Sequence, residues 1–370
     1  MNVRRLAAVI TVALLFGVVA EWPRQAAGQS TAESGAAWTF AVSGDSRNCG
    51  DVVMPGIAAS AARHQPEFYW HLGDFRAIYT FDEDILHLPQ YRKNPPLVYT
   101  YLTTAWTDFI DNQIKLFGAV PVFLGIGNHE LIYPKTREEW IPQFADWLDN
   151  PVIREQREKD NPHDYRVKTY YHWTARGVDF ISLDNASLEQ FDDAQMQWLK
   201  AVIGRDAGDS AIKTVVVGMH RALPDSISAS HSMNESPAGL LTGRQVYAQL
   251  LHLQNESHKR VYILASHSHF YMENVFNTEY WRTNGGILAG WIVGTAGAVR
   301  YRLPPNAKDA RVAETDVYGY LLGTVSSDGS IRFDFQRLQE IDIPASVKER
   351  YTAEFVHWCF VENRSLAPMP

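Results

Sequence analysis

The stretch Val-Pro-Val-Phe-Leu-Gly-Ile-Gly-Asn-His-Glu, residues 120–130, runs from an apolar segment directly into three adjacent polar residues, Asn128, His129 and Glu130. A short apolar run that ends at glycine is typical of a buried strand. Polar side chains at the end of a buried strand are costly unless they find partners. The stretch therefore predicts a strand that ends in a cluster of functional side chains, and not in an ordinary turn.

Other apolar runs along the chain end in side chains of the same kind. In chain order, they end in Gly44-Asp45-Ser46-Arg47, Gly73-Asp74, Gly218-Met219-His220 and Ser266-His267-Ser268-His269. A Gly-Asp pair alone is usually a turn, and a His-x-His pair is more often two exposed or core histidines. The complete ordered set is far more specific than any of its members, so it indicates one site that gathers these side chains.

Strand-like apolar runs alternate with helical spacing, which predicts an α/β layered domain without internal repeats. Buried strands are expected at residues 38–42, 68–72, 120–126, 178–183, 214–217, 261–264, 290–293 and 318–325, with a hairpin at Ser327-Asp328-Gly329. Helices are expected at residues 53–64, 102–117, 194–203 and 244–253. Three segments do not fit the alternation, so residues 75–101 and 221–239 are expected to overhang the site and residues 150–168 to form a charged, solvated excursion.

The order and chemistry of the strand-end fragments resemble the calcineurin-like metallophosphoesterases, which hydrolyse phosphate esters with two adjacent metal ions. The resemblance extends from about Trp38 to Phe335, most of the chain. It implies a four-layer αββα sandwich with two central mixed β-sheets. It also implies a divalent or trivalent metal cofactor (Fe, Zn or Mn), with one or two ions per chain.

Carried over position by position, the resemblance assigns ligands to two adjacent metal sites that share a bridging aspartate. The first set is Asp45, Asp74 and His269, and the second set is Asp74, Asn128, His220 and His267. His129 is the implied general acid that protonates the leaving oxygen, and Glu130 is expected to orient it or tune its charge. Asp184 has two open interpretations, an acidic residue near the site or a turn or cap residue. Arg221 likewise has two, a contact to substrate phosphate or a surface salt bridge.

Arg47 departs from the family pattern, because the first motif usually reads Asp-x-His and a guanidinium has no lone pair with which to replace histidine. The purple acid phosphatases also lack that histidine, but they supply a tyrosine three residues after the bridging aspartate, where this chain has Ala77. Asn48, Cys49 and Tyr79 remain candidates to complete the first site. Weak occupancy by two metals ranks first, a one-metal enzyme in which Arg47 holds phosphate ranks second, and an inert Arg47–Asp45 pair third.

The N-terminus has the features of a secretory signal. Arg4 and Arg5 precede an apolar run over residues 6–20, and small residues follow at 26–28. The run is shorter than the ~20 residues of a membrane-spanning helix, so no stable membrane span is expected. The expected organisation is a signal peptide at 1–28, a flexible leader at 29–37, a metallophosphoesterase domain at 38–340, and a C-terminal extension at 341–370 packing on that domain.

The net charge limits the kinds of partner that the protein can be expected to bind, and the cysteine content bears on whether it is exported. The formal net charge is −8, and removing the signal peptide's three arginines and one glutamate makes it −10, which argues against nucleic acid as a partner. The two cysteines, Cys49 and Cys359, are either a disulfide or isolated thiols in an exported protein. A disulfide would tie the Asp45 loop to the C-terminal extension.

The sequence thus favours an exported, periplasmic or secreted, phosphoesterase that attacks a phosphate mono- or diester with a metal-bound water. Its substrate is expected to be a small-molecule or lipid-head phosphate ester. The alternative is a secreted protein that binds a phosphate ligand through a degenerate, inert metal site. Only Arg47 favours the alternative, while the presence of His129, which is not a ligand in the family scheme, favours the enzyme.

Overall fold

A computed structural model of the chain describes residues 37–187 and 191–366. The expected signal peptide and nearly all of the expected leader lie outside the described residues. Within the described ranges, no helix is long and apolar enough to cross a membrane.

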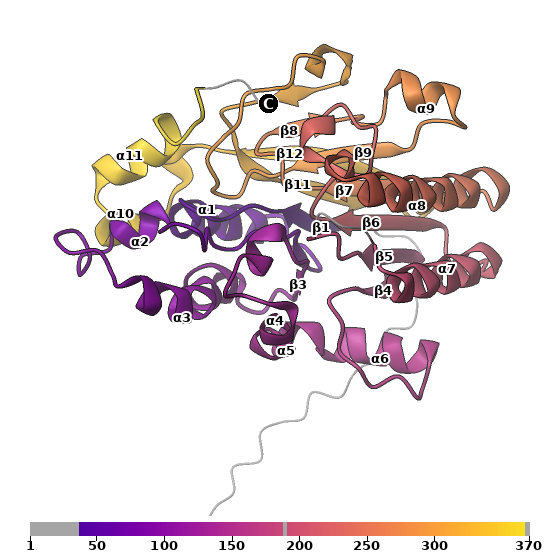
Figure 1. Cartoon of the computed structure of the whole chain (residues 1–370), viewed down its shortest axis with the longest axis horizontal. Coiled ribbons are helices and arrows are strands. Elements are labelled where there is room, and N and C mark those ends of the chain that lie inside the picture. The colour runs from indigo at the N-terminus through magenta and orange to yellow at the C-terminus, as the bar shows by residue number, and fades with distance from the viewer. Residues whose placement is uncertain (1–36, 188–190, 367–370) are drawn as a thin grey trace, which may run out of the picture. The chain divides into compact units, whose positions relative to one another are not determined.

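Two mixed β-sheets form the centre of the fold (Figure 1). The first sheet has the order β12 (Ile331–Leu338), β11 (Tyr318–Val325), β1 (Trp38–Ser43), β2 (Tyr69–His71), β3 (Val122–Leu124). The second has the order β10 (Ala313–Glu314), β8 (Tyr271–Glu273), β9 (Ala289–Val293), β7 (Arg260–Ala265), β6 (Thr214–Met219), β5 (Val178–Ser182), β4 (Tyr171–Ala175). The neighbouring strands β1, β2 and β3 are parallel, as are β5, β6, β7 and β9, so their carboxyl ends point the same way within each sheet.

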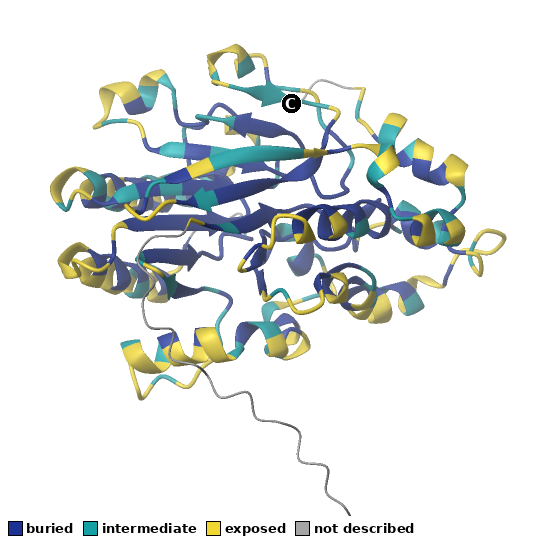
Figure 2. Cartoon of the chain, turned by 180° about the vertical axis from the view of Figure 1, so that it is seen from behind, coloured by how far each residue is buried: buried dark blue, intermediate teal, exposed yellow. Residues whose placement is uncertain are grey.

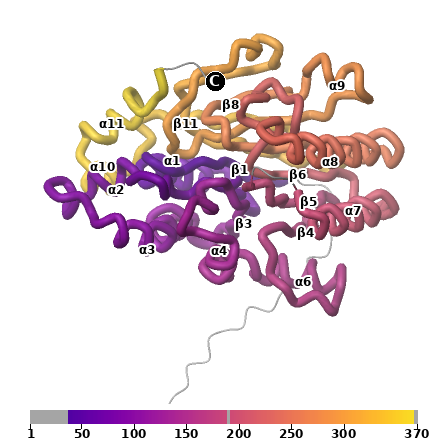
Figure 3. Tube along the Cα trace, in the orientation of Figure 1, coloured from indigo at the N-terminus to yellow at the C-terminus, as the bar shows by residue number. Residues whose placement is uncertain are grey.

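Helices flank the two sheets, which gives the α/β architecture that the resemblance implied. On the side of the first sheet, α1 (Gly50–Ala62) contacts β11 and β12, and on the other side α8 (Pro237–Glu256) contacts β7 and α7 (Asp193–Gly208). The remaining helices are α2 (Glu83–Leu86), α3 (Val98–Phe109), α4 (Arg137–Gln143), α5 (Ala145–Leu148), α6 (Pro151–Asp160), α9 (Glu279–Thr283), α10 (Ala345–Arg350) and α11 (Ala353–Val361). Figure 3 follows the same path as a tube, from the indigo β1 to the yellow α11.

A layer of aromatic rings fills the space between the sheets. Phe40 on β1 lies 5.0 Å from Phe180 on β5, and Trp70 on β2 lies 5.1 Å from Trp173 on β4, measured between ring centroids. All four side chains are buried, and the strands at the centre of the fold are mostly dark blue in Figure 2. The inter-sheet layer therefore fixes the two sheets, and the loops at their strand ends, relative to each other.

The predicted strands are present, with boundaries that differ by up to a few residues, and the predicted hairpin joins β11 to β12. The predicted helices differ more. The helix expected over 244–253 starts at Pro237, and the helix expected over 194–203 continues to Gly208. The expected helix over 102–117 starts earlier, at Val98, and after Phe109 it continues as a π-helical segment, Ile110–Ile114, and a 3-10 turn, Lys115–Phe117. The excursion at 150–168 contains helix α6, because Asn150 caps its first turn and Ile153 is buried against the domain.

A glycine in the inter-sheet layer gives a test of this packing. A Cβ on Gly218 in β6 would lie 2.2 Å from the indole ring of Trp70, so Gly218→Ala should lower the free energy of unfolding by about 1–3 kcal/mol, measured by urea denaturation. Gly204 in α7 is the matched control, because no described atom beyond its own surroundings in the helix lies within 4 Å of its added Cβ. Gly204→Ala should stabilise the protein by about 0.5–1 kcal/mol. Equal effects of the two substitutions would contradict the close approach.

Candidate metal centre

The predicted site residues come together where strands of both sheets end. Asp45 follows β1 and Asp74 follows β2, while His220 and His267 follow β6 and β7 of the second sheet. Asp45, Asp74 and His267 have φ values of 61°, 60° and 65°, a region that non-glycine residues adopt at a cost of roughly 1–3 kcal/mol each. Strained backbone at three candidate ligands is the pattern of a functional site, because the surrounding structure must hold these residues in place.

The second ligand set forms a compact group of donor atoms around His220. Its Nε2 lies 2.9 Å from Asn128 Oδ1, 3.0 Å from His267 Nδ1 and 3.3 Å from Asp74 Oδ1. His220 Nδ1 faces the carbonyl oxygen of Leu72 at 3.1 Å, where only a donor is favourable. In the neutral ring Nε2 therefore turns its lone pair toward the other three donor atoms.

This arrangement attracts positive charge. Although burial lowers it, the carboxylate of Asp74 raises the pKa of His220 above its ordinary value. The pKa of Asp74 lies well below its ordinary value despite burial, because His129, His220 and Arg47 surround it. A proton or a metal ion would satisfy the same donors, and two imidazoles with carboxylate and amide oxygens suit zinc, iron or manganese. The residues present therefore fit a metal ion.

The first ligand set is also brought together, but it contains fewer donors. One oxygen each from Asp45 and Asp74 and one ring nitrogen from His269 lie within 4.8 Å of one another. Asp45 Oδ1 is 3.2 Å from His269 Nε2. Asp45 Oδ1 and Asp74 Oδ2 are buried and have no hydrogen-bond partner among the described residues. Two buried carboxylate oxygens without such a partner need a nearby cation.

Arg47 lies at this first set and is 7% exposed. Its Nη2 is 3.2 Å from His269 Nε2, and its Nε is 3.7 Å from Asp74 Oδ2. Although burial lowers it, Asp74 raises the pKa of Arg47 above its usual value. The guanidinium is thus a permanent cation among the ligands of the first set.

His129 and Glu130 have different surroundings. His129 Nδ1 donates to the carbonyl oxygen of Ala77 at 2.6 Å, while Nε2 lies 3.6 Å from Asp74 Oδ2. Burial lowers the pKa of His129 to about 4, and Asp74 offsets part of that decrease. The ring is therefore fixed in orientation, with Nε2 directed toward the ligand cluster.

Glu130 binds backbone and does not contact the ring of His129 through a hydrogen bond in the described structure. Its carboxylate accepts hydrogen bonds from the backbone N–H groups of Asp74 (2.9 Å), Phe75 (2.9 Å) and Gly127 (2.7 Å). Burial and the charge of Asp74 raise the pKa of Glu130 to about 7. These bonds join the Asp74 loop to the loop that carries Asn128, so the contacts indicate a positioning role for Glu130.

The remaining candidates near the site have structural partners. Asp184 accepts hydrogen bonds from Arg137 and from the Ala186 backbone, which corresponds to the turn interpretation. Arg221 pairs with Glu235 at 3.0 Å, but it is buried, so the pair is not the surface salt bridge of the second interpretation.

Two of the three candidates to complete the first set have other partners. Asn48 Nδ2 donates to Asn363. Cys49 forms a disulfide with Cys359, which is one of the two alternatives left open by the sequence and links the Asp45 loop to the C-terminal extension. Tyr79 is 65% exposed, and its ring centroid lies 5.2 Å from that of His129. The disulfide removes the Cys49 thiolate as a ligand and the Asn48 side chain is engaged with Asn363, while Tyr79 stays a candidate.

Sequence reasoning did not single out every residue near the ligands, and Tyr301 and Glu235 are two examples. The ring of Tyr301 stacks on His269 with centroids 4.0 Å apart, and Glu235 Oε1 lies 3.8 Å from His267 Nε2. Both belong to segments without strand-end motifs, so neighbouring sequence gave no signal for either. Their proximity follows from the tertiary structure alone.

The contrast between a positioning residue and a ligand gives a prediction. In metal-free protein, Glu130→Gln should lower the free energy of unfolding by about 1–3 kcal/mol, because the amide NH₂ would face a backbone N–H that loses its acceptor. It should also weaken metal binding, measured by calorimetry, through displacement of Asp74. His267→Ala is the matched ligand variant, and it should weaken metal binding more while lowering metal-free stability less. Unchanged metal-free stability of Glu130→Gln would contradict the positioning role.

Comparisons with known proteins agree with this geometry at the level of the fold. No protein-family model matches the sequence. No curated protein matches it either. Among solved structures, a purple acid phosphatase from yellow lupin (Lupinus luteus) seeds superposes with a TM-score of 0.55 at 14% identity, over 82% of this chain and 52% of that one. The chain thus spans about half the length of the lupin enzyme.

A second solved structure matches over nearly its entire length. A dimetal phosphatase from Danio rerio has a TM-score of 0.50 at 12% identity, and the match covers 81% of this chain and 96% of that one. Similarity at such low identity concerns the fold and leaves activity to be argued from the site. The two mixed sheets, the flanking helices and the ligand groups at the strand ends give this chain the fold of the calcineurin-like metallophosphoesterases.

Proposed function

We propose that this protein is an exported, metal-dependent phosphoesterase that hydrolyses a phosphate mono- or diester. The observation that carries the proposal is the second ligand set, in which Asp74, Asn128, His220 and His267 converge with a donor composition suited to a metal ion. A divalent ion held there would supply Lewis acidity and a water nucleophile near neutral pH. The fold of the two phosphatases described above supports the same reaction class.

The chain's own residues supply positioning, charge and a proton-transfer group. His129 is the proposed proton-transfer group, because the bond from its Nδ1 to Ala77 fixes the ring with Nε2 toward the ligand cluster. In the neutral ring Nε2 carries a lone pair, so it would first take up the proton released by the attacking water and then pass that proton to the leaving oxygen. Arg47 offers guanidinium donors suited to phosphate oxygens. Glu130 holds the Asp74 loop and the Asn128 loop in register through backbone hydrogen bonds.

Export rests on two features in different parts of the chain. The N-terminal sequence has the charge and hydropathy pattern of a signal peptide. The Cys49–Cys359 disulfide supports the same location, because disulfides persist mainly in oxidising compartments. A periplasmic or secreted enzyme acting on a small-molecule or lipid-head phosphate ester is consistent with both features.

Hydrolysis is tested directly on the purified mature protein. It should hydrolyse an aryl phosphate or an aryl phosphodiester when manganese, zinc or iron is added, and it should lose that activity in a chelator. Restoration by the metal after the chelator is removed is the control for irreversible unfolding. Absence of turnover of both ester classes with all three metals would refute the enzyme and leave a phosphate-binding protein.

The role of His129 is tested by separating turnover from metal content. His129→Ala should lower turnover about 10²–10⁴-fold, the usual contribution of positioned proton transfer, while elemental analysis shows unchanged metal. Asn128→Ala, at the neighbouring residue, is the matched variant and should lose metal because Asn128 belongs to the second ligand set. If His129→Ala loses metal as Asn128→Ala does, His129 is a ligand and not the proton-transfer group.

A further inference from the structure

The guanidinium of Arg47 lies where the ligands of the first set converge. Nη2 is 3.2 Å from His269 Nε2, and Nε is 3.7 Å from Asp74 Oδ2. His269 and Asp74 are two of the three residues that could hold a metal ion in the first set. A metal ion and the guanidinium would therefore compete for the same side chains.

The hydrogen bonds of His269 show which of its ring nitrogens carries the lone pair that a metal ion would need. Its Nδ1 faces the carbonyl oxygen of Val299 at 2.7 Å, where it must act as a donor. In the neutral ring Nε2 then carries the lone pair, and Arg47 Nη2 donates to it. Tyr301 stacks on the same ring, with the two ring centroids 4.0 Å apart. The lone pair required for a metal bond is thus already in use.

The charges of the buried carboxylates also favour a guanidinium in the first set. Asp45 and Asp74 are fully buried, and Asp45 Oδ1 and Asp74 Oδ2 lack hydrogen-bond partners in the described part of the chain. An adjacent permanent cation reduces the electrostatic cost of burying these carboxylates. Arg47 provides that cation without binding anything from solution.

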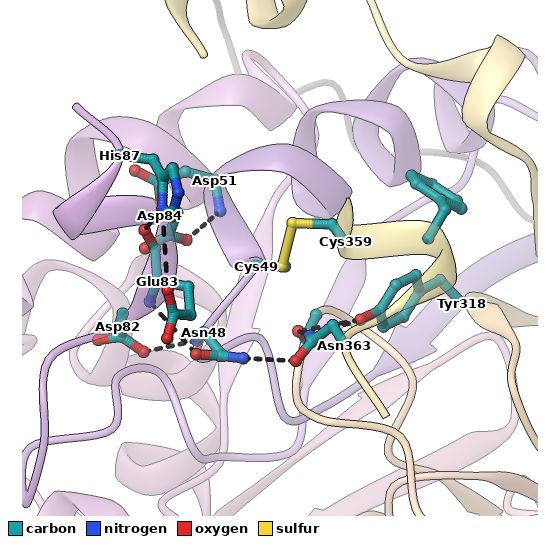
Figure 4. Close-up of a disulfide and its surroundings, with 12 residues drawn as sticks. Asn48, Cys49, Asp51, Asp82, Glu83, Asp84, His87, Tyr318, Cys359 and Asn363 are labelled. Carbon is teal, nitrogen blue, oxygen red and sulfur yellow. Dashed lines mark hydrogen bonds and ion pairs between the residues drawn. A yellow bond between two sulfur atoms is a disulfide. The ribbon is translucent and has the colours of Figure 1, made fainter. Parts of the chain in front are cut away.

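The backbone on either side of Arg47 is fixed, so the guanidinium is not on a freely moving loop. The next residue, Asn48, donates from its backbone N–H to Asp82 at 2.5 Å and from its side chain to Asn363 at 2.6 Å (Figure 4). Cys49 follows and is bonded to Cys359 in helix α11. The C-terminal extension therefore holds the segment that presents Arg47 to the first set.

We propose that the Arg47 guanidinium takes the place of the first metal ion, so that the protein holds one divalent ion, in the second set. This inference rests on the proposed function for its catalytic meaning. In that setting the guanidinium binds non-bridging phosphate oxygens of the ester through paired N–H donors, the contact that arginine makes best with phosphate. The substrate phosphate is then held between one metal ion and one arginine.

Metal stoichiometry tests the inference without any substrate. The mature protein, stripped of metal and titrated with Mn²⁺, should bind one equivalent tightly and give the electron paramagnetic resonance spectrum of an isolated Mn²⁺ ion. Arg47→His removes the guanidinium and supplies an imidazole lone pair, so it should bind two equivalents and show the spectrum of a coupled pair. Arg332→His places a new histidine at an exposed position of β12 and should remain at one equivalent, which controls for adventitious binding.

Two results would overturn the inference. One is binding of two coupled Mn²⁺ ions by the unmodified protein, and the other is a single equivalent in Arg47→His. Kinetics add a second readout, because loss of the phosphate contact in Arg47→His should lower kcat/KM roughly tenfold to a hundredfold although a metal ion is gained. An equal or higher kcat/KM would show that Arg47 only displaces a ligand. If the unmodified protein hydrolyses no ester, the proposed function fails while the stoichiometry still decides the role of Arg47.

Discussion

Two buried carboxylates, Asp45 and Asp74, lie close together at the meeting point of the two sheets, and the surrounding site compensates their charge. Both are completely inaccessible to solvent. The pKa of Asp74 is held well below its ordinary value, against the effect of burial, by His129, His220 and Arg47. The folded structure therefore requires positive charge near these two carboxylates, and the same positive charge is suited to binding phosphate. This single constraint accounts for the histidines, for the buried arginine and for the fit to a metal ion.

The side chains that compensate Asp45 and Asp74 come from both sheets, so the two sheets must be held in a fixed relative position. Backbone hydrogen bonds cross between them beside the ligands, from Gly44 N to Val293 O at 3.1 Å and from Ala296 N to Gly44 O at 3.0 Å. The side chain of Ser266 donates to Leu72 O at 3.1 Å, again from one sheet to the other. The aromatic layer between the sheets lies beneath these contacts. Rigid support of this kind can maintain the positive φ angles of the ligand residues.

A second buried charge cluster supports the segment that follows Asp74. Arg76 is fully buried and pairs with Asp51 at 2.5 Å, with Asp84 at 3.0 Å and with Asp108. Asp51 lies in α1, Asp84 in α2 and Asp108 in α3, so one guanidinium joins three helices. Together with the disulfide, this cluster attaches the Asp45 and Asp74 loops to the helical layer. Removing one partner of such a buried ion pair leaves an uncompensated buried charge, which strongly destabilises the folded state. Attachment of the two loops to the helices is therefore coupled to folding of the whole domain.

The sequence by itself determined the fold class and the approximate positions of the strands, and the family resemblance carried by its strand-end motifs named the ligand candidates. Buried strands need apolar residues, and polar residues at their ends are costly without a purpose, so both features are visible in local patterns such as residues 120–130. Only the tertiary structure decided which partners the candidates contact. It placed Glu130 on backbone amides, Arg47 on His269, and Tyr301 and Glu235 beside the ligands. These contacts join residues from distant segments or depend on where a side chain points, and no local pattern encodes either. The helix at Pro151–Asp160 was missed for a related reason, since burial of Ile153 against the domain stabilises a segment that is otherwise dominated by charged residues.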